Sequence, residues 1–205
     1  MLAIIDYGAG NLRSVQKACE LLGAEAVITS DASIINQADH VILPGVGAFG
    51  DCMQSLQNAG LVDTVKKAAL SGKPFLGICL GMQLLFDSSE ETPGVPGLGI
   101  FSGDIVKISK QDGYKIPHMG WNSLSFPQET PLFQGLPDTP FVYFVHSFYA
   151  KPKDLSIVAA TTNYCGELTV AIRKDNIFAT QFHPEKSGDV GLSILKNFLD
   201  ARGNF

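Results

Sequence analysis

Short apolar runs separated by amphipathic stretches dominate the first ninety or so residues of the chain. Runs of four or five apolar residues fit buried strands, whereas apolar residues spaced three and four apart favour helices packed on a sheet. We expect helices from the turn at residues 7–11 to about residue 22, where Gly23 would end the helix, and over amphipathic sequence through residue 70. The expected strands cover residues 2–5, 25–29, 40–43 and 75–78. This alternation of strand and helix is typical of an open parallel sheet.

The pattern changes after residue 91. A loop rich in Pro and Gly covers residues 92–99, and strand-like stretches without intervening helices follow it, so antiparallel strands should extend the sheet. These stretches are residues 105–108, 141–148, 157–161, 168–172 and 177–181. A closing helix over about residues 189–201 would bury Leu192, Leu195, Phe198 and Leu199. The pattern predicts an α/β fold with an open, mostly parallel sheet, flanking helices and antiparallel additions, in a single domain over residues 1–205.

Composition and charge narrow the classes of function. A chain of 205 residues with 45% hydrophobic residues can bury the core of one domain. The net charge of -5, without a block of like charge, gives no footprint for nucleic acid or an anionic membrane, and no window has the length of a membrane span. We therefore expect a small-molecule substrate or a protein partner.

The cysteines lie far apart and include no Cys-x-x-Cys pair, so neither a zinc site nor a disulfide framework is expected. They are Cys19, Cys52, Cys79 and Cys165. Such thiols are typical of a cytoplasmic protein, where they stay reduced.

Cys79 lies in the segment Gly77-Ile-Cys-Leu-Gly81, between a predicted strand and the helix-forming residues 82–86. Glycines two residues to either side fit a sharp strand-to-helix elbow, in which Cβ atoms would be crowded. The elbow would expose the thiol at the strand end and at a helix N-terminus, which favours the thiolate. Cys79 is therefore a candidate nucleophile, and the alternative is a small, inert core residue.

A cysteine nucleophile needs a base, and the base needs an orienting acceptor. His183 directly follows the predicted strand at 177–181, and Glu185 stands two residues later, with a proline between them. The carboxylate could hold the imidazole in one tautomer, although a solvated surface pair is the alternative. Among the other histidines, His40 is expected to be a capping or surface residue, and His118 and His146 are expected to be structural. None of the histidines is expected to bind a metal.

Acyl chemistry also needs hydrogen-bond donors where negative charge develops. The Gly45-Val-Gly47 loop after the third strand can present free N–H groups, and the N–H of Leu80 points from the start of the helix. Val46, Gly47 and Leu80 are thus a candidate oxyanion hole, although the glycines could also mark only a tight turn. Ligands of open sheets bind beyond the carboxyl ends of the strands, so these loops should share one edge.

Two motifs together resemble those of the class I, or triad-type, glutamine amidotransferases: Gly77-Ile-Cys-Leu-Gly-Met-Gln83 and Phe182-His-Pro-Glu185. The resemblance covers essentially the whole chain, and it implies the flavodoxin-like fold of that class. Within the class, the chain is most similar to the glutaminase subunits of imidazole glycerol phosphate synthases, of histidine biosynthesis. The segments that carry this similarity are Tyr7-Gly-Ala-Gly-Asn11, Pro44-Gly-Val-Gly-Ala-Phe49, Pro117-His-Met-Gly-Trp-Asn122, Tyr143-Phe-Val-His-Ser147 and His183-Pro-Glu-Lys-Ser187.

The resemblance implies that Cys79 attacks the side-chain amide of L-glutamine, giving a γ-glutamyl thioester and ammonia, and that water then releases glutamate. His183 would transfer the protons and Glu185 would orient it. No cofactor is needed for this chemistry. The substrate-binding residues that the resemblance implies are Gln83, Glu91 and Phe148, with the backbone at Gly47 and Ser147.

The resemblance also implies a partner, the cyclase subunit, a (β/α)8 barrel that would use the ammonia within a heterodimer to form imidazole glycerol phosphate and AICAR. Four positions match residues that face this barrel: Asn11, Trp121, Asn122 and Lys186. Without the resemblance they would be interpreted as a helix cap, a buried anchor, a turn residue and a solvated lysine.

The free glutaminase is typically poor in this family, which suggests a resting oxyanion hole that lacks a donor. One hypothesis is that the peptide between Val46 and Gly47 points its C=O inward at rest and flips on activation, which glycine makes sterically easy, although the sequence does not reveal the resting orientation.

Three other functions compete with this one. The chain could serve a different synthase, such as that of anthranilate or pyridoxal phosphate, but residues 117–122 and Lys186 disfavour this. It could be a γ-glutamyl hydrolase that acts alone. A non-catalytic subunit on the same fold is disfavoured because Cys79, His183 and Glu185 are all present.

Overall fold

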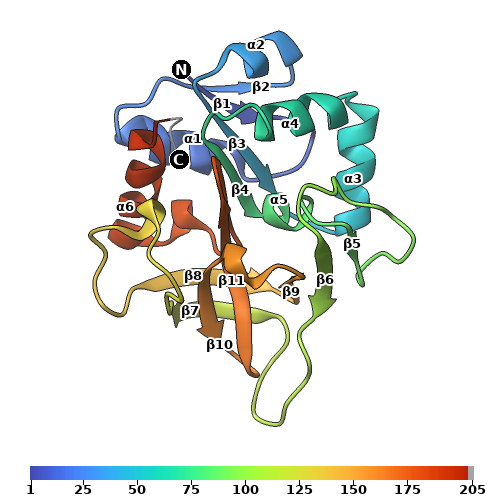
Figure 1. The fold of residues 1–205 in the computed structure, drawn as a ribbon, viewed down its shortest axis with the longest axis vertical. Helices are drawn as coiled ribbons and strands as arrows, with labels where there is room; N and C mark the ends of the chain where they lie inside the picture. The colour runs from blue at the N-terminus through green and yellow to red at the C-terminus, as the bar shows by residue number, and fades with distance from the viewer. Residues whose placement is uncertain (203–205) are drawn as a thin grey trace.

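A computed structural model describes residues 1–202 as one large mixed sheet with helices on both faces and a small two-stranded sheet beside it (Figure 1). The helices are α1 (Leu12–Leu21), α2 (Ala32–Gln37), α3 (Phe49–Asn58), α4 (Val62–Ala69), α5 (Leu80–Gln83) and α6 (Gly188–Asp200). The strands are β1 (Leu2–Ile5), β2 (Ala26–Thr29), β3 (His40–Gly45), β4 (Phe75–Cys79), β5 (Ser88–Ser89), β6 (Gly103–Lys107), β7 (His118–Ser123), β8 (Phe141–His146), β9 (Phe148–Pro152), β10 (Val158–Asn163), β11 (Glu167–Lys174) and β12 (Ile177–Thr180). Short 3-10 turns lie at η1 (Pro131–Phe133), η2 (Leu155–Ile157) and η3 (Pro184–Lys186).

The large sheet has the order β2-β1-β3-β4-β12-β11-β9-β6-β5, with β10 paired to β11. In this order, the neighbouring strands from β2 to β12 (β2, β1, β3, β4 and β12) are parallel. Antiparallel pairing then adds β11, β9, β6 and β10. Strands β7 and β8 form the separate antiparallel sheet. The predicted fold class, with its antiparallel additions, is confirmed.

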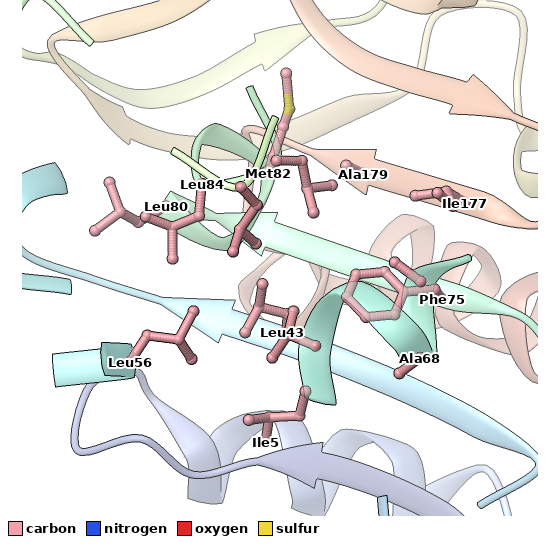
Figure 2. Close-up of a cluster of buried hydrophobic side chains, with 14 of the residues drawn as sticks. Ile5, Leu43, Leu56, Ala68, Phe75, Leu80, Met82, Leu84, Ile177 and Ala179 are labelled. Atoms are coloured by element: carbon pink, nitrogen blue, oxygen red, sulfur yellow. The ribbon is translucent and has the colours of Figure 1, made fainter. Parts of the chain in front are cut away.

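Alternation of side chains along the central strands decides which helices cover which face. In β1, Ala3 and Ile5 point into a cluster with helices α2 to α5, while Leu2 and Ile4 point into a second cluster with α1 and α6. Figure 2 shows part of the first cluster, where Leu43, Phe75 and Ile177 from three neighbouring strands meet helical side chains. Each such fully buried side chain contributes about 2 kcal/mol to folding.

Several predicted boundaries were wrong, and in each case local conformation or tertiary pairing explains the difference. The helical sequence expected to run through residue 70 is broken at Gly60, whose φ of +67° separates α3 from α4. The short helix α2 was not predicted, and the Asp31 carboxylate caps it by accepting a 2.7 Å hydrogen bond from the N–H of Ser33. The helix expected over 82–86 is instead the single turn α5.

In the second half, the stretch 141–148 is two strands in two different sheets. Strand β8 ends at His146 and pairs with β7, whereas β9 begins at Phe148 and pairs with β6 and β11. Ser147 alone links them. Strand β7 itself was not predicted as a strand.

The predicted burial of Leu195 and Phe198 in the closing helix α6 is confirmed. Ile194 is buried as well, whereas Leu192 and Leu199 are only partly buried.

Candidate active site

The elbow at Cys79 is present, and the packing around it explains its glycines. Cys79 has φ +55° and ψ -111°, a strained conformation for a residue with a side chain. A Cβ on Gly77 would lie 3.0 Å from the backbone of Gly81, and one on Gly81 would overlap the carbonyl oxygen of Leu43. Helix α5 therefore packs directly on the end of β3. Because α5 is a single turn, the dipole available to Cys79 is smaller than that of the longer helix expected from the sequence.

His183 and Glu185 form a buried pair beside Cys79. The Nδ1 of His183 lies 2.8 Å from Oε1 of Glu185, and their side chains are 2% and 1% exposed, so the interpretation as a solvated surface pair is wrong. The Nε2 atom makes no hydrogen bond with any residue in the range 1–202, which leaves it available to a reacting group.

The environment of His183 favours its charged form. Burial by itself lowers the pKa of His183, but Cys79 and Glu185 outweigh burial and raise the pKa to about 9. An imidazolium beside a thiol is the arrangement that activates cysteine nucleophiles.

A cavity of about 310 Å³ lies at the carboxyl ends of the central strands, and it brings most of the predicted site residues together. A volume of this size suits a small ligand. The lining residues are Val46, Gly47, Cys79, Leu80, Gln83, Glu91, Pro117, Val145, His146, Ser147, Phe148 and His183. Glu185 does not line the cavity and stands behind His183. Pro117, Val145 and His146 were not predicted as lining residues.

The candidate oxyanion loop has an orientation different from the expected one. Gly47 has φ +100°, and the carbonyl oxygen of Val46 accepts a 3.3 Å hydrogen bond from Sγ of Cys52, on α3. Cys52 does not line the cavity, so this carbonyl points toward α3 and not inward.

Glu91 has a structural contact in addition to its place in the cavity wall. Its Oε2 atom accepts a 2.7 Å hydrogen bond from the N–H of Phe49, at the start of α3. This contact fixes the carboxylate beside the cavity, where it can attract a cation.

A buried glutamine that sequence reasoning passed over lies between the nucleophile and Gln83. Gln181 is fully buried, its Nε2 donates to Sγ of Cys79 at 3.6 Å, and its Oε1 accepts from Nε2 of Gln83 at 2.9 Å. The sequence shows Gln181 only as the polar end of an apolar strand, immediately before Phe182-His183. A polar residue at the end of a buried strand was the one sign in the sequence that Gln181 could have a role in the site.

Two structural histidines support the far wall of the cavity. Nδ1 of His146 donates to the carbonyl oxygen of Phe148 at 2.8 Å, so in the neutral ring Nε2 accepts from Nδ1 of His118 at 2.9 Å. Burial lowers the pKa of His118 to about 4 and that of His146 to about 3, which keeps both rings neutral. The structural interpretation of both residues agrees with these contacts.

Two of the four predicted partner-facing residues lie together on the surface around Tyr143. Trp121 is 55% exposed and contacts the ring of Tyr143 edge-on at 6.3 Å, so its interpretation as a buried anchor is wrong. Lys186 is exposed, with Nζ 6.0 Å from the centre of the same ring.

The two asparagines also differ from their local interpretations. Asn11 precedes α1 but makes no side-chain capping bond. Asn122 lies in strand β7 and not in a turn, and its Nδ2 donates to the carbonyl oxygen of Asn163 at 3.1 Å.

Other features limit the chemistry of the described range. Over residues 1–202, no group of three or more His, Cys, Asp or Glu side chains could hold a metal ion. In the same range, no helix combines the length and apolar character that crossing a membrane requires. All four cysteines are buried free thiols.

Comparisons with known proteins agree with this geometry. The chain matches the family model "Glutamine amidotransferase class-I" over residues 3–201. It is 51% identical to the "Imidazole glycerol phosphate synthase subunit HisH" of Syntrophotalea carbinolica over 205 residues, covering 98% of this chain and 100% of that protein. It is 52% identical to the protein of the same name from Methanothermobacter thermautotrophicus over 200 residues, 98% of each chain. A chain of PurLQS from Thermotoga maritima has a similar fold, with a TM-score of 0.75, 21% identity and 97% of each chain covered.

Proposed function

The chain belongs to the class I glutamine amidotransferases, and on this premise we propose that it is the glutaminase subunit of an imidazole glycerol phosphate synthase, in histidine biosynthesis. The observation that carries the proposal is a sequence identity of 51% and 52% to two relatives of that name over nearly the whole chain. The cavity lined by both Cys79 and His183 agrees with it. A single amidotransferase domain over residues 1–205 is part of the proposal.

In the proposed reaction, the thiolate of Cys79 attacks the side-chain carboxamide carbon of L-glutamine. The C–N bond breaks as Nε2 of His183 gives its proton to the leaving nitrogen, so ammonia departs and a γ-glutamyl thioester remains. His183 then takes a proton from water, the hydroxyl adds to the thioester, and glutamate leaves as the thiol re-forms. Acid–base catalysis of this kind contributes about 10²- to 10⁴-fold.

Glu185 supports His183 in both steps. Its bond to Nδ1 fixes which nitrogen faces the substrate and stabilises the imidazolium that Cys79 generates. The N–H groups of the Val46–Gly47 loop and of Leu80 border the cavity, and they would stabilise the tetrahedral oxyanion. Each such donor is worth about 10²- to 10³-fold in rate.

Substrate binding would use the remaining residues of the wall. The Glu91 carboxylate suits the α-ammonium group of glutamine, and Gln83 offers a buried acceptor, since its Oε1 has no partner among the described residues. Ser147 and Phe148 would close the opposite side.

The partner of this subunit would be the cyclase subunit, a (β/α)8 barrel that consumes the ammonia. The exposed side chain of Trp121, which packs edge-on against the half-buried ring of Tyr143, supports a docking surface, because Trp and Tyr are enriched at interfaces. Lys186 lies beside the same ring. The four free thiols support a cytoplasmic site of action, where cysteines stay reduced.

The test is glutamate release from glutamine by the purified chain, alone and with the cyclase subunit plus its nucleotide substrate, with Cys79→Ala as the control. We expect strong release only in the complex and none from the variant. Full activity of the chain alone, unchanged by the barrel, would instead favour a γ-glutamyl hydrolase. Activity that responds to another synthase would identify a different partner.

A further inference from the structure

Two buried carboxamides lie in series behind the nucleophile. Gln181, at the end of β12, is 0% exposed, and Gln83, in α5, is 4% exposed. Oε1 of Gln181 accepts from Nε2 of Gln83 at 2.9 Å, and Nε2 of Gln181 donates to Sγ of Cys79 at 3.6 Å. Sulfur is a weak acceptor as a thiol and a stronger one as a thiolate, so this donor favours the reactive form.

A backbone carbonyl fixes the direction of this series. The oxygen of Phe148 can only accept, and it receives Nδ1–H of His146 at 2.8 Å and Nε2–H of Gln83 at 3.4 Å. Turning the Gln83 amide over would bring its Oε1 against two acceptors, the oxygens of Phe148 and Gln181. The nitrogen of Gln83 must therefore face them, which leaves Oε1 on the other side.

The Oε1 atom of Gln83 is the unsatisfied end of the series. It is buried, makes no hydrogen bond with any residue of the described range, and belongs to a side chain that lines the cavity. A buried acceptor without a partner is unfavourable by about 1–3 kcal/mol. A ligand that brings an N–H donor to this atom would recover that free energy.

We propose that Gln181 is a positioning residue for the glutaminase reaction: it orients Gln83 so that an acceptor faces the substrate's N–H group, and it holds a donor against the Cys79 sulfur. This inference rests on the proposed function for its substrate. One side chain thereby sets the orientation of both the substrate-binding amide and the nucleophile. It does so without touching the substrate.

The test replaces Gln181 by methionine, which keeps the length of the side chain and removes both hydrogen bonds. The matched control is Thr180→Val, the adjacent buried residue, whose Oγ1 donates only to the carbonyl oxygen of Phe182. In the complex with the cyclase subunit, we expect Gln181→Met to raise KM for glutamine about tenfold, the effect of one lost hydrogen bond with its partner left unpaired. In the free chain, alkylation of Cys79 by iodoacetamide should slow severalfold. The control should change neither quantity more than about twofold.

A double-mutant cycle separates positioning from a merely structural role. If Gln181 acts on the substrate through Gln83, the KM effect of Gln181→Met should largely vanish in a chain that already carries Gln83→Met. Additive effects on KM, or a Gln181→Met chain that matches the unsubstituted chain in KM and alkylation, would overturn the proposal.

Two further outcomes are decisive. If Gln181→Met does not fold, Gln181→Glu keeps the shape and the acceptor for Gln83 but sets an acid against the sulfur. At about pH 8 it should alkylate several times more slowly with KM little changed, and unchanged alkylation would overturn the proposal. If the unsubstituted chain fails to hydrolyse glutamine even with the cyclase subunit, the proposed function is wrong. The alkylation rates would still test whether Gln181 acts on Cys79.

Discussion

In the proposed reaction, Cys79 and His183 activate one another, and Glu185 determines how strongly. The side chain of Glu185 is 1% exposed and, among residues 1–202, bonds only to the imidazole through one oxygen, so its charge is poorly screened by water. Without this carboxylate, the effect of burial, which lowers the pKa of His183, would be opposed less strongly, and the pKa of His183 would fall.

We therefore predict that Glu185→Gln lowers glutamate release by about 10²- to 10⁴-fold, because the imidazolium loses its counter-charge and its orientation. The matched control is Asp189→Asn, which removes an exposed acid four residues later and should leave activity within about twofold. Rates are measured in the complex at saturating glutamine. Equal rates for the two variants would contradict the role given to Glu185.

A second prediction at this scale concerns His146, which is buried beside His118 and His183. Its pKa is about 3 in the folded chain and about 6.5 when unfolded, so below pH 6.5 the unfolded chain binds a proton that the folded chain does not. Stability should thus fall as pH falls, by about 2 kcal/mol from this residue between about pH 7 and pH 5. In urea unfolding at both pH values, His146→Gln should reduce the acid-induced loss by that amount. An unchanged loss would show that His146 titrates normally.

At the residue scale, the sequence was sufficient to predict contacts that follow from local spacing. Cys79 between two glycines, and Glu185 two residues after His183, can be recognised without knowing which strands are neighbours. Gln181 could not, because its partner Gln83 is 98 residues away and they meet only when β12 pairs with β4. The orientation of the Val46 carbonyl was likewise decided by a side chain from α3.

At the scale of elements, the contact of α5 with β3 holds the elbow in place. The backbone of Gly81 lies against the carbonyl of Leu43, and a Cβ on Gly45 would lie 2.8 Å from both the backbone N of Gly81 and the hydroxyl of Tyr7. No side chain at position 81 can be accommodated without moving the strand or the turn.

We predict that Gly81→Ala destabilises the chain by about 3 kcal/mol or more, because backbone must shift in a close-packed layer. Gly94→Ala is the control, since a Cβ there meets open space and costs about 1 kcal/mol for its positive φ. Urea unfolding monitored by circular dichroism gives both values. A Gly81→Ala chain as stable as Gly94→Ala would show that α5 can move away from β3.

Element boundaries could be predicted where an element coincides with a short apolar run. They could not be predicted where hydrogen bonding to a neighbouring strand determines the end of a strand. Four of the parallel strands, at residues 2–5, 26–29, 40–45 and 75–79, were found because buried parallel strands have continuous apolar sequence. The stretch 141–148 has equally continuous β-forming sequence, yet it divides between two sheets. Nothing in its own residues indicates where one set of hydrogen bonds ends and another begins.

At the scale of the whole molecule, the small sheet connects the cavity with the proposed docking surface. Strand β7 carries exposed Trp121 and, three residues earlier, buried His118, which bonds to His146 in the cavity wall. A partner on this surface would lie two side chains from the cavity.

We predict that Trp121→Ala weakens binding to the cyclase subunit at least tenfold, about the effect of losing an aromatic anchor at an interface, while the stability of the free chain changes by less than about 0.5 kcal/mol. The control is Leu155→Ala, another exposed apolar residue at 73% exposure. Isothermal titration calorimetry measures both affinities. Because Trp121 is the one tryptophan of the chain, its emission in the unsubstituted protein should also shift on binding.

Ser147 gives the small sheet a mechanical connection to the cavity. It is the single residue between β8 and β9, and with Phe148 it lines the cavity, while its carbonyl is tied to the N–H of Ile108 at 2.9 Å. The β7–β8 ribbon is thus joined to the large sheet through a residue in the wall of the cavity. We expect a protein docked on the ribbon to move Ser147 and so to change the shape of the cavity that Ser147 lines.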